Sequence, residues 1–409
     1  MATENMRNES RNINDQVKKT NQIFVMKKVA MIVGLAAALG FNNAKAADWN
    51  WNGDVRERFE SQHISPKEDT NTDTTGSSRV RTRVRLGASV WINEELSSGF
   101  QLATGDDATK ETISRNQTFT GTFQPKNFYL NEAFIDYHPT ALDGKINLLI
   151  GKRDVSNTII RVDNLVYDSD LTFEGATLQY GKDANGKEKD GLIGIAGYYF
   201  LNEYNSTTTS SPYLYIAQGA YKGEINDISY LFGAGYNLYK NLQNLLIVDT
   251  NATAKSTSVP ANWTNSGYNV AELFGKIGGQ LSDTLPWKLY SQYAFNTASQ
   301  ADHSKIIDSK RKAWLGGVTI GDAKQVGDWA LDAKYVRIQR DAVFPLFTDS
   351  DRKPVDIVNI NGFEVAGTYH LVQNMTIGAR YYQYNNIDAS ATAYNPKLHQ
   401  LQLDALVKF

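Results

Sequence analysis

The sequence contains no cysteine and only 9 prolines among its 409 residues. Without cysteine, disulfide bonds and thiolate-bound metal sites are excluded. Long apolar runs are also missing, because apart from one short segment near the N-terminus no stretch reaches the roughly 20 apolar residues of a membrane-spanning helix. The mean hydropathy of −0.42 agrees with this absence. These features exclude a helical membrane protein and a disulfide-stabilised secreted domain.

The short apolar segment covers 29–41 and has the features of a secretory signal peptide. Two lysines precede it, and the small-residue sequence AKA, which ends at Ala46, follows it as a cleavage signal. We therefore expect 1–46 to comprise an N-terminal extension and a cleaved signal peptide. The mature protein is then 47–409, with cleavage between Ala46 and Ala47 or close to it.

Signatures of nucleic-acid binding and of catalysis are also missing. Removing 1–46 takes away seven Lys/Arg and three Asp/Glu and changes the formal net charge from −2 to −6, whereas a nucleic-acid-binding protein is usually basic. No G-x-S-x-G sequence is present. The five histidines have no recognisable catalytic spacing; they are His63, His138, His303, His370 and His399. We expect neither an enzyme nor a nucleic-acid partner, and no cofactor.

The most regular feature of the remaining chain is an alternation of polar and apolar residues, which is typical of β-strands with two different faces. Sixteen segments alternate in this way, and none has a helical period. Most are long enough for a tilted strand that crosses a bilayer, which needs about 9–11 residues. Their approximate ranges are 49–60, 78–91, 97–105, 127–138, 145–153, 171–181, 191–202, 212–224, 227–240, 270–281, 287–297, 312–321, 328–340, 359–371, 375–386 and 397–409.

The connections between these segments are alternately long and short along the whole chain. The sequences EIND and LVQN are typical of tight turns, whereas 241–269 and 341–358 are long. Bacterial outer-membrane barrels have this layout, with short periplasmic turns, long extracellular loops and an even number of strands. The sequence therefore predicts an all-β fold, a transmembrane antiparallel β-barrel of about sixteen strands.

One segment, SRVRTRVRLG, has an arginine at every second position; these are Arg79, Arg81, Arg83 and Arg85. An arginine that faces lipid near the bilayer midplane costs roughly 2–4 kcal/mol, so four would cost roughly 8–16 kcal/mol, comparable with the whole stability of a protein. The arginine face must therefore look toward water and the opposite face toward lipid. A closed barrel of this size pairs every backbone group and is wide enough for an aqueous channel.

The last segment, HQLQLDALVKF, alternates in the same way and ends on Phe409. It resembles the C-terminal signal of bacterial outer-membrane barrels, except that Asp404 stands where glycine is usual. Trp49 and Trp51 lie near a predicted strand end, where interfacial aromatic residues are expected. Further candidates for this outer aromatic girdle are Tyr381, Tyr382 and Tyr384.

Three sequences together resemble the putative porin family of bacterial outer-membrane proteins: SRVRTRVRLG, NEAFIDYHP and LVYDSDLTFEGATLQY. The matching positions are Arg79 to Arg85, Asp136-Tyr137, Asp168-Ser169-Asp170-Leu171 and Glu174-Gly175, while Tyr167 stands where the family usually has tryptophan. The clear resemblance covers about 49–180. It implies a porin of the sixteen-strand type, assembled as a homotrimer, in the bacterial outer membrane.

We expect a channel with a charged lining. Its basic wall comprises Arg56, Arg58, Arg79, Arg81, Arg83 and Arg85. The candidate acidic groups are Glu132 and Asp136 on the inner face of a strand, and Asp163, Asp168 and Asp170 in the third long connection. In general porins one long loop folds into the barrel and sets acidic groups against a basic wall, which narrows the passage. We expect 154–170 to do so; the alternative is that the arginines pair locally with carboxylates and serve only folding.

The predicted function is passive diffusion of small hydrophilic solutes through an outer-membrane channel, with membrane lipid and a second and third copy of the chain as partners. A channel specific for sugars or acidic oligomers, and a structural or adhesin barrel, remain alternatives. The sequence DSD occurs at 168–170 and at 349–351, and Asp106-Asp107 is also acidic. Such loop carboxylates can bind Ca²⁺ but are usually only solvated, so we predict no metal site.

Overall fold

Antiparallel hydrogen bonding joins the strands of the computed structural model into one continuous sheet. The structure describes residues 49–65, 75–105, 114–205, 207–245, 267–300, 306–352, 357–388 and 397–409. The strands are β1 (Trp49–Ser65), β2 (Thr75–Asn93), β3 (Leu96–Thr104), β4 (Gln117–Thr118), β5 (Phe128–Tyr137), β6 (Ile146–Asp154), β7 (Thr172–Tyr180), β8 (Gly191–Phe200), β9 (Tyr213–Ile225), β10 (Ile228–Lys240), β11 (Asn269–Ser282), β12 (Leu285–Asn296), β13 (Lys312–Gly321), β14 (Trp329–Ile338), β15 (Ile360–Val372), β16 (Met375–Asn386) and β17 (Lys397–Lys408).

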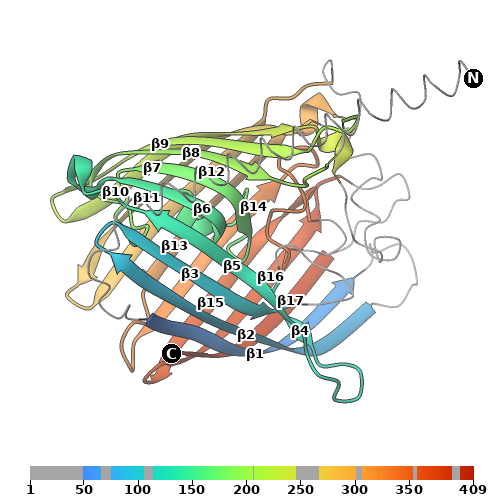
Figure 1. Cartoon of the computed structure of the whole chain (residues 1–409). Coiled ribbons are helices and arrows are strands. Elements are labelled where there is room, and N and C mark those ends of the chain that lie inside the picture. Colours follow the sequence, from blue (N-terminus) through green and yellow to red (C-terminus); the bar gives the residue numbers. More distant parts are fainter. Residues whose placement is uncertain are drawn as a thin grey trace, which may run out of the picture. The chain divides into compact units, whose positions relative to one another are not determined.

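The sheet closes on itself, because β1 pairs with β2 on one side and with β17 on the other. Of the 17 strands, the two-residue β4 only extends the edge of β2, so the wall has sixteen strands. Figure 1 shows these strands inclined together around the wall, with the C-terminus beside the start of β1. The prediction of a closed antiparallel barrel of about sixteen strands is confirmed.

The helical elements within the described ranges are short. They are α2 (Val155–Thr158) and the 3₁₀ turns η1 (Ala141–Gly144), η2 (Leu242–Asn244) and η4 (Asp308–Lys310). No helix in the described part of the chain has the length and apolarity needed to cross a membrane. The predicted signal peptide lies outside the described residues.

Long and short connections alternate as predicted, so the barrel has a loop end and a turn end. At the turn end, Asn226 and Asp227 join β9 to β10 with φ angles of 49° and 64°. Two residues with positive φ form the turn that matches the twist of a hairpin, and asparagine and aspartate tolerate this conformation. The register of each hairpin, and with it the face on which each side chain lies, follows from such turns.

The outer face of the barrel is apolar. Phe363 and Val365 are 37% and 38% exposed, whereas the intervening Glu364 is 1% exposed and points inward. On β16 the same alternation corrects part of the girdle prediction. Tyr381 faces outward, but Tyr382 and Tyr384 face inward and are buried. Adjacent residues of a strand lie on opposite faces, so Tyr381 and Tyr382 cannot both belong to an outer girdle.

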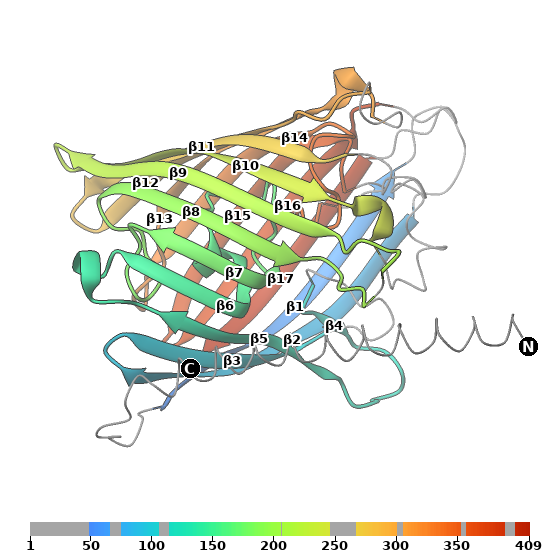
Figure 2. The ribbon, with the colours of Figure 1, turned by 45° about the horizontal axis from the view of Figure 1, so that its top comes forward.

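A large part of the barrel interior is filled by protein. The connection 155–171 between β6 and β7 and the connection 341–352 between β14 and β15 fold inward and share one apolar core with the wall; Ile160, Tyr167, Phe344, Ile195 and Leu315 belong to it. In Figure 2 these connections cross the space enclosed by the strands. We call them the first inner loop (155–171) and the second inner loop (341–352). A cavity remains on the side of β1 to β6.

We expect Val365→Arg to lower the free energy of unfolding by about 2–4 kcal/mol, because the new charge would face lipid. Thr368→Arg, on the inner face of the same strand, is the matched control and should cost much less. Urea unfolding in lipid vesicles, followed by tryptophan fluorescence, measures both. Equal losses would contradict the assignment of the two faces.

Candidate functional site

The basic wall lies on the inner face of β1 and β2, and carboxylates of the same wall hold most of its arginines. Arg58 forms a two-point contact with Asp404 of β17, at 2.7 Å from Nε to Oδ1 and 2.8 Å from Nη2 to Oδ2. Asp404, which departs from the usual C-terminal signal, thus pairs with a lumen arginine. Arg83 and Arg85 share Asp54, with N–O distances of 2.9 and 2.6 Å.

The other arginines of the basic wall also have partners close by. Glu60 is fully buried and lies 2.5 Å from Arg79 Nη2 and 3.6 Å from Arg81 Nη1. Arg56 donates a hydrogen bond to Asn116 at 2.6 Å. Local pairing therefore accounts for part of the wall, as the folding alternative expects.

The first inner loop is fixed to the far wall by its backbone and by one tyrosine. Ile160 donates its N–H to Gln218 Oε1 of β9 at 2.8 Å and accepts the amide of the same side chain at 3.0 Å. The Tyr167 hydroxyl donates to Asn237 Oδ1 of β10 at 3.0 Å. The apolar side chains of the loop are buried against the side of the barrel that contains β9 and β10. The last residues of the loop therefore lie toward the basic wall.

The structure separates the three acidic residues predicted in this loop. Asp170 lies 3.5 Å from Arg83 and 3.6 Å from Arg85, so it faces the basic wall. Asp163 lies on the opposite side, where Lys334 Nζ donates to it at 2.7 Å. Asp168 accepts from the backbone N–H groups of Asp170 at 2.8 Å and Ser350 at 3.3 Å.

The second inner loop brings a further acidic residue to the basic wall, which the sequence analysis did not select. Asp351 Oδ2 lies 3.1 Å from Arg58 Nη1. The two DSD sequences adopt the same turn, in which the first aspartate accepts the N–H two residues later, at 2.8 Å in one loop and 2.9 Å in the other. The repeated tripeptide at 168–170 and 349–351 was the signal that could have identified it.

The two inner loops are fastened to each other. Asp168 donates its N–H to the Phe347 carbonyl at 2.7 Å, and Thr348 Oγ1 donates to the Leu165 carbonyl at 2.9 Å. Arg352 is fully buried and donates to Glu364 Oε1 of β15 at 2.6 Å. The loops therefore form one unit, which contacts the basic wall at two places.

The aspartates of the two inner loops differ in the direction in which their pKa is shifted. Burial raises the pKa of Asp170, but Arg83 and Arg85 outweigh it and keep the pKa below its usual value. In the same way Arg58 overcomes burial and lowers the pKa of Asp351 to about 2. Burial, and then the neighbouring Asp349, raise the pKa of Asp168 well above its usual value. The arginines of the wall thus favour the charged forms of Asp170 and Asp351, whereas burial disfavours the charged form of Asp168.

The two acidic residues predicted on β5 lie apart from these contacts. Asp136 is 3% exposed, and its carboxylate is 3.4 Å from His138 Nδ1 and 3.8 Å from Arg153 Nη1. Glu132 accepts the N–H of Asp154 at 3.4 Å. Of these two residues, only Glu132 lines the cavity inside the barrel.

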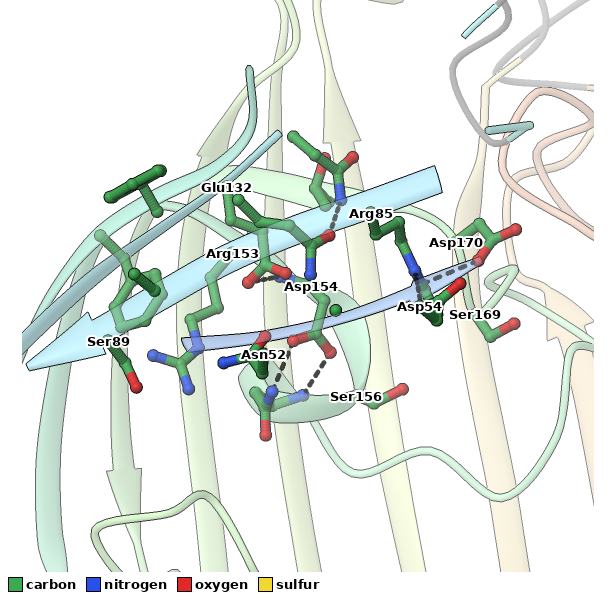
Figure 3. Close-up of a pocket in the computed structure, with 18 of the residues that line it drawn as sticks. Asn52, Asp54, Arg85, Ser89, Glu132, Arg153, Asp154, Ser156, Ser169 and Asp170 are labelled. Carbon is green, nitrogen blue, oxygen red and sulfur yellow. Dashed lines mark hydrogen bonds and ion pairs between the residues drawn. The ribbon is translucent and has the colours of Figure 1, made fainter. Parts of the chain in front are cut away.

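This cavity has a volume of about 530 Å³ and lies between the first inner loop and β1 to β6. Figure 3 shows Asp54, Arg85 and Asp170 at one side of it and Glu132, Arg153 and Asp154 at another. Its lining is therefore polar and carries both signs of charge. Within the described residues no group of three metal-ligating side chains occurs, and Asp106-Asp107 lies outside them.

The sequence matches the profile of the putative porin family over 36–273 and 261–409. Among solved structures, the chain is similar to OprB of Pseudomonas putida at high pH, with a TM-score of 0.52 and 10% identity, over 88% of this chain and 94% of that chain. It is also similar to OmpF of Salmonella typhi in complex with daunomycin, with a TM-score of 0.49 and 12% identity, over 89% of this chain and 98% of that chain. A third similar structure is the outer-membrane channel DcaP of Acinetobacter baumannii, with a TM-score of 0.48 and 12% identity, over 90% of this chain and 99% of that chain. No curated protein sequence matches the chain.

We expect Glu364→Gln to lower the free energy of unfolding by roughly 3 kcal/mol, because it removes the shortest of the three carboxylate contacts of the buried Arg352 and leaves only Asp163 and Asp349 at 3.5 and 3.6 Å. Glu174→Gln is the control. Glu174 faces outward and is 60% exposed in its pair with Lys152, so its loss should cost less than about 1 kcal/mol. Urea unfolding in lipid vesicles measures both variants, and equal effects would show that Glu364 does not secure the second inner loop.

Proposed function

Because the chain belongs to the putative porin family, we propose that it is a water-filled outer-membrane channel for passive diffusion of small hydrophilic solutes. The observation that carries the proposal is the position of Asp170, which an inward-folded loop holds at 3.5 Å from Arg83 and 3.6 Å from Arg85. Opposed charges in a narrow passage orient polar solutes and limit them by size and charge. The turn end then faces the periplasm, and the N-terminal segment is removed as a signal peptide during export.

The proposal assigns the constriction to two loops. The first inner loop approaches the basic wall through Asp170, and the second approaches it through Asp351 at 3.1 Å from Arg58. Solutes would pass along β1 to β6, where the cavity lies. On this proposal the pore-lining charges are the basic wall, Glu132, Asp170 and Asp351, while Asp163 and Asp168 support the loops.

A hydrolytic enzyme is the less favoured reading, although three side chains lie in the order of a catalytic triad. Ser97 Oγ is 3.3 Å from His138 Nε2, and Asp136 Oδ1 is 3.4 Å from His138 Nδ1. A substrate must reach the serine, yet Ser97 is 9% exposed and does not line the cavity. His138 Nδ1 is also closer to Asn147 Oδ1, at 2.9 Å. This cluster supports a structural role at the turn end.

We also propose a homotrimer, on two features of the outer surface. Glu57, the central residue of β1, faces outward and accepts a hydrogen bond from Thr82 at 2.7 Å. A carboxylate there is costly against lipid, whereas a neighbouring protein chain can supply hydrogen-bond donors to it. Phe123, in the segment that projects beyond β4 in Figure 1, is 102% exposed and has a φ of 66°, which bulky residues rarely adopt. Both features favour contact with another copy of the chain.

Reversing charge on the basic wall tests the constriction. We expect Arg83→Glu to shift the permeability ratio toward cations by roughly tenfold, because Asp54 and Asp170 would lose one of the two arginines that they share and would face a new carboxylate. Arg81→Glu should act in the same direction. The measurement is the reversal potential across planar bilayers under a salt gradient. Arg337→Glu, on the outer face, is the matched control, and an unchanged ratio in the lumen variants would remove the basic wall from the constriction.

We expect Phe123→Ser to convert the trimer to monomers, because an exposed aromatic residue at an interface contributes a large share of its binding energy. Native mass spectrometry in detergent measures the oligomeric state. Leu192→Ser, which removes a 68% exposed apolar residue elsewhere on the wall, is the control and should stay trimeric. A trimer of unchanged stability in the Phe123 variant would contradict the proposed interface.

A further inference from the structure

The cavity between the first inner loop and β1 to β6 contains an arginine whose guanidinium group is little used by the protein. Arg153 stacks on Phe134, with 3.6 Å between its guanidinium carbon and the ring centroid. Among the described residues no hydrogen-bond acceptor reaches its Nε. Its ion pair within the described part of the chain, with Asp136, is long at 3.8 Å. By contrast, Arg58, Arg83 and Arg85 each lie 2.9 Å or less from a carboxylate of the wall.

The stacking on Phe134 fixes the plane of this guanidinium group. An arginine held in this way loses little conformational freedom when it binds a carboxylate through two parallel hydrogen bonds. In Figure 3 the guanidinium end of Arg153 points away from Glu132, toward the side of the cavity where Asn52 and Ser89 are drawn. The cavity thus offers a positioned cation together with neutral hydrogen-bonding side chains.

The same cavity contains a carboxylate that no cation of the described residues contacts closely. Glu132 forms no ion pair among the described residues, and its one hydrogen bond is the 3.4 Å contact from the Asp154 N–H. The other acidic groups of the lining are engaged. Asp54 and Asp170 contact Arg83 and Arg85, and Asp154 accepts from the backbone and side chain of Asn157.

These groups exclude some classes of solute. The charged residues of the lining are Arg85, Arg153, Lys408, Asp54, Glu132, Asp154 and Asp170, so acidic groups are in slight excess. A multiply charged anion would meet repulsion from Glu132 and Asp154, and a simple cation would meet it from Arg153. A solute that carries both charges satisfies the unused cation and the unused anion together.

We infer that this cavity is a binding site for small zwitterions, namely amino acids and dipeptides. The solute carboxylate pairs with Arg153 and its ammonium group pairs with Glu132, while the amide side chains around them bind its polar groups. A cavity of about 530 Å³ accommodates a molecule of this size together with water. The inference rests on the proposed channel function and adds to it a preferred class of solute.

Uptake into proteoliposomes tests the inference, with radiolabelled glutamine and glycylglycine as zwitterions and arabinose as a neutral solute of similar mass. We expect zwitterion uptake to saturate and arabinose uptake to rise linearly with concentration. Arg153→Gln and Glu132→Gln should each raise the half-saturation concentration for zwitterions about tenfold, the effect of losing one charge-assisted contact. Arg153→Lys, which keeps the charge but loses the planar fork, should have an intermediate effect.

Arabinose uptake in each variant shows that the barrel is still folded and open, and Arg337→Gln removes an outward-facing arginine as a control. Linear uptake of all three solutes, or half-saturation values that neither variant changes, would overturn the inference and leave the channel intact. If no solute enters, the channel itself is overturned and the inference falls with it.

Discussion

The structure depends on the pairing of inward-facing arginines with carboxylates inside a closed sheet. Closure satisfies the backbone, but it leaves the basic wall of β1 and β2 within the barrel, where unpaired charge is costly. Within the barrel wall itself, the carboxylates that pair with these arginines are Asp54, Glu60 and Asp404. Two further carboxylates, Asp170 and Asp351, pair with these arginines from the two inner loops. The interactions that stabilise the wall therefore also position the two inner loops.

The inner loops act as one unit because polar and apolar contacts reinforce each other. Tyr167 and Phe347 belong to a shared apolar core, and the buried Arg352 joins that core to Glu364 of the wall. A loop held only by ion pairs with the basic wall would exchange them for water and salt. The packing against the far wall removes that freedom, so the distance between Asp170 and the arginines is set by the rigid barrel.

Much of the fold could be predicted from the sequence, because alternation with a period of two determines both strand position and face. The sixteen predicted segments each coincide with an observed strand. Asp170, one of the three candidates for facing the arginines, lies beside Arg83 and Arg85. The solute and the roles of the lining residues are still predictions. The role of the second inner loop was missed. Asp351 reaches Arg58 only because Phe344 and Phe347 pack into the interior, and no local pattern shows whether a long loop turns inward or outward. For the same reason the position of Asp163 beside Lys334 could not be derived.

The most direct test of this account is the conductance of the refolded 47–409 chain in planar lipid bilayers. The account predicts discrete, uniform current steps whose size grows in proportion to salt concentration, since ions cross a permanent aqueous passage along the basic wall. The same protein should show the circular dichroism of a β-barrel. Folded, membrane-inserted protein that gives no current steps would contradict the central claim, because the inner loops would then close the barrel completely.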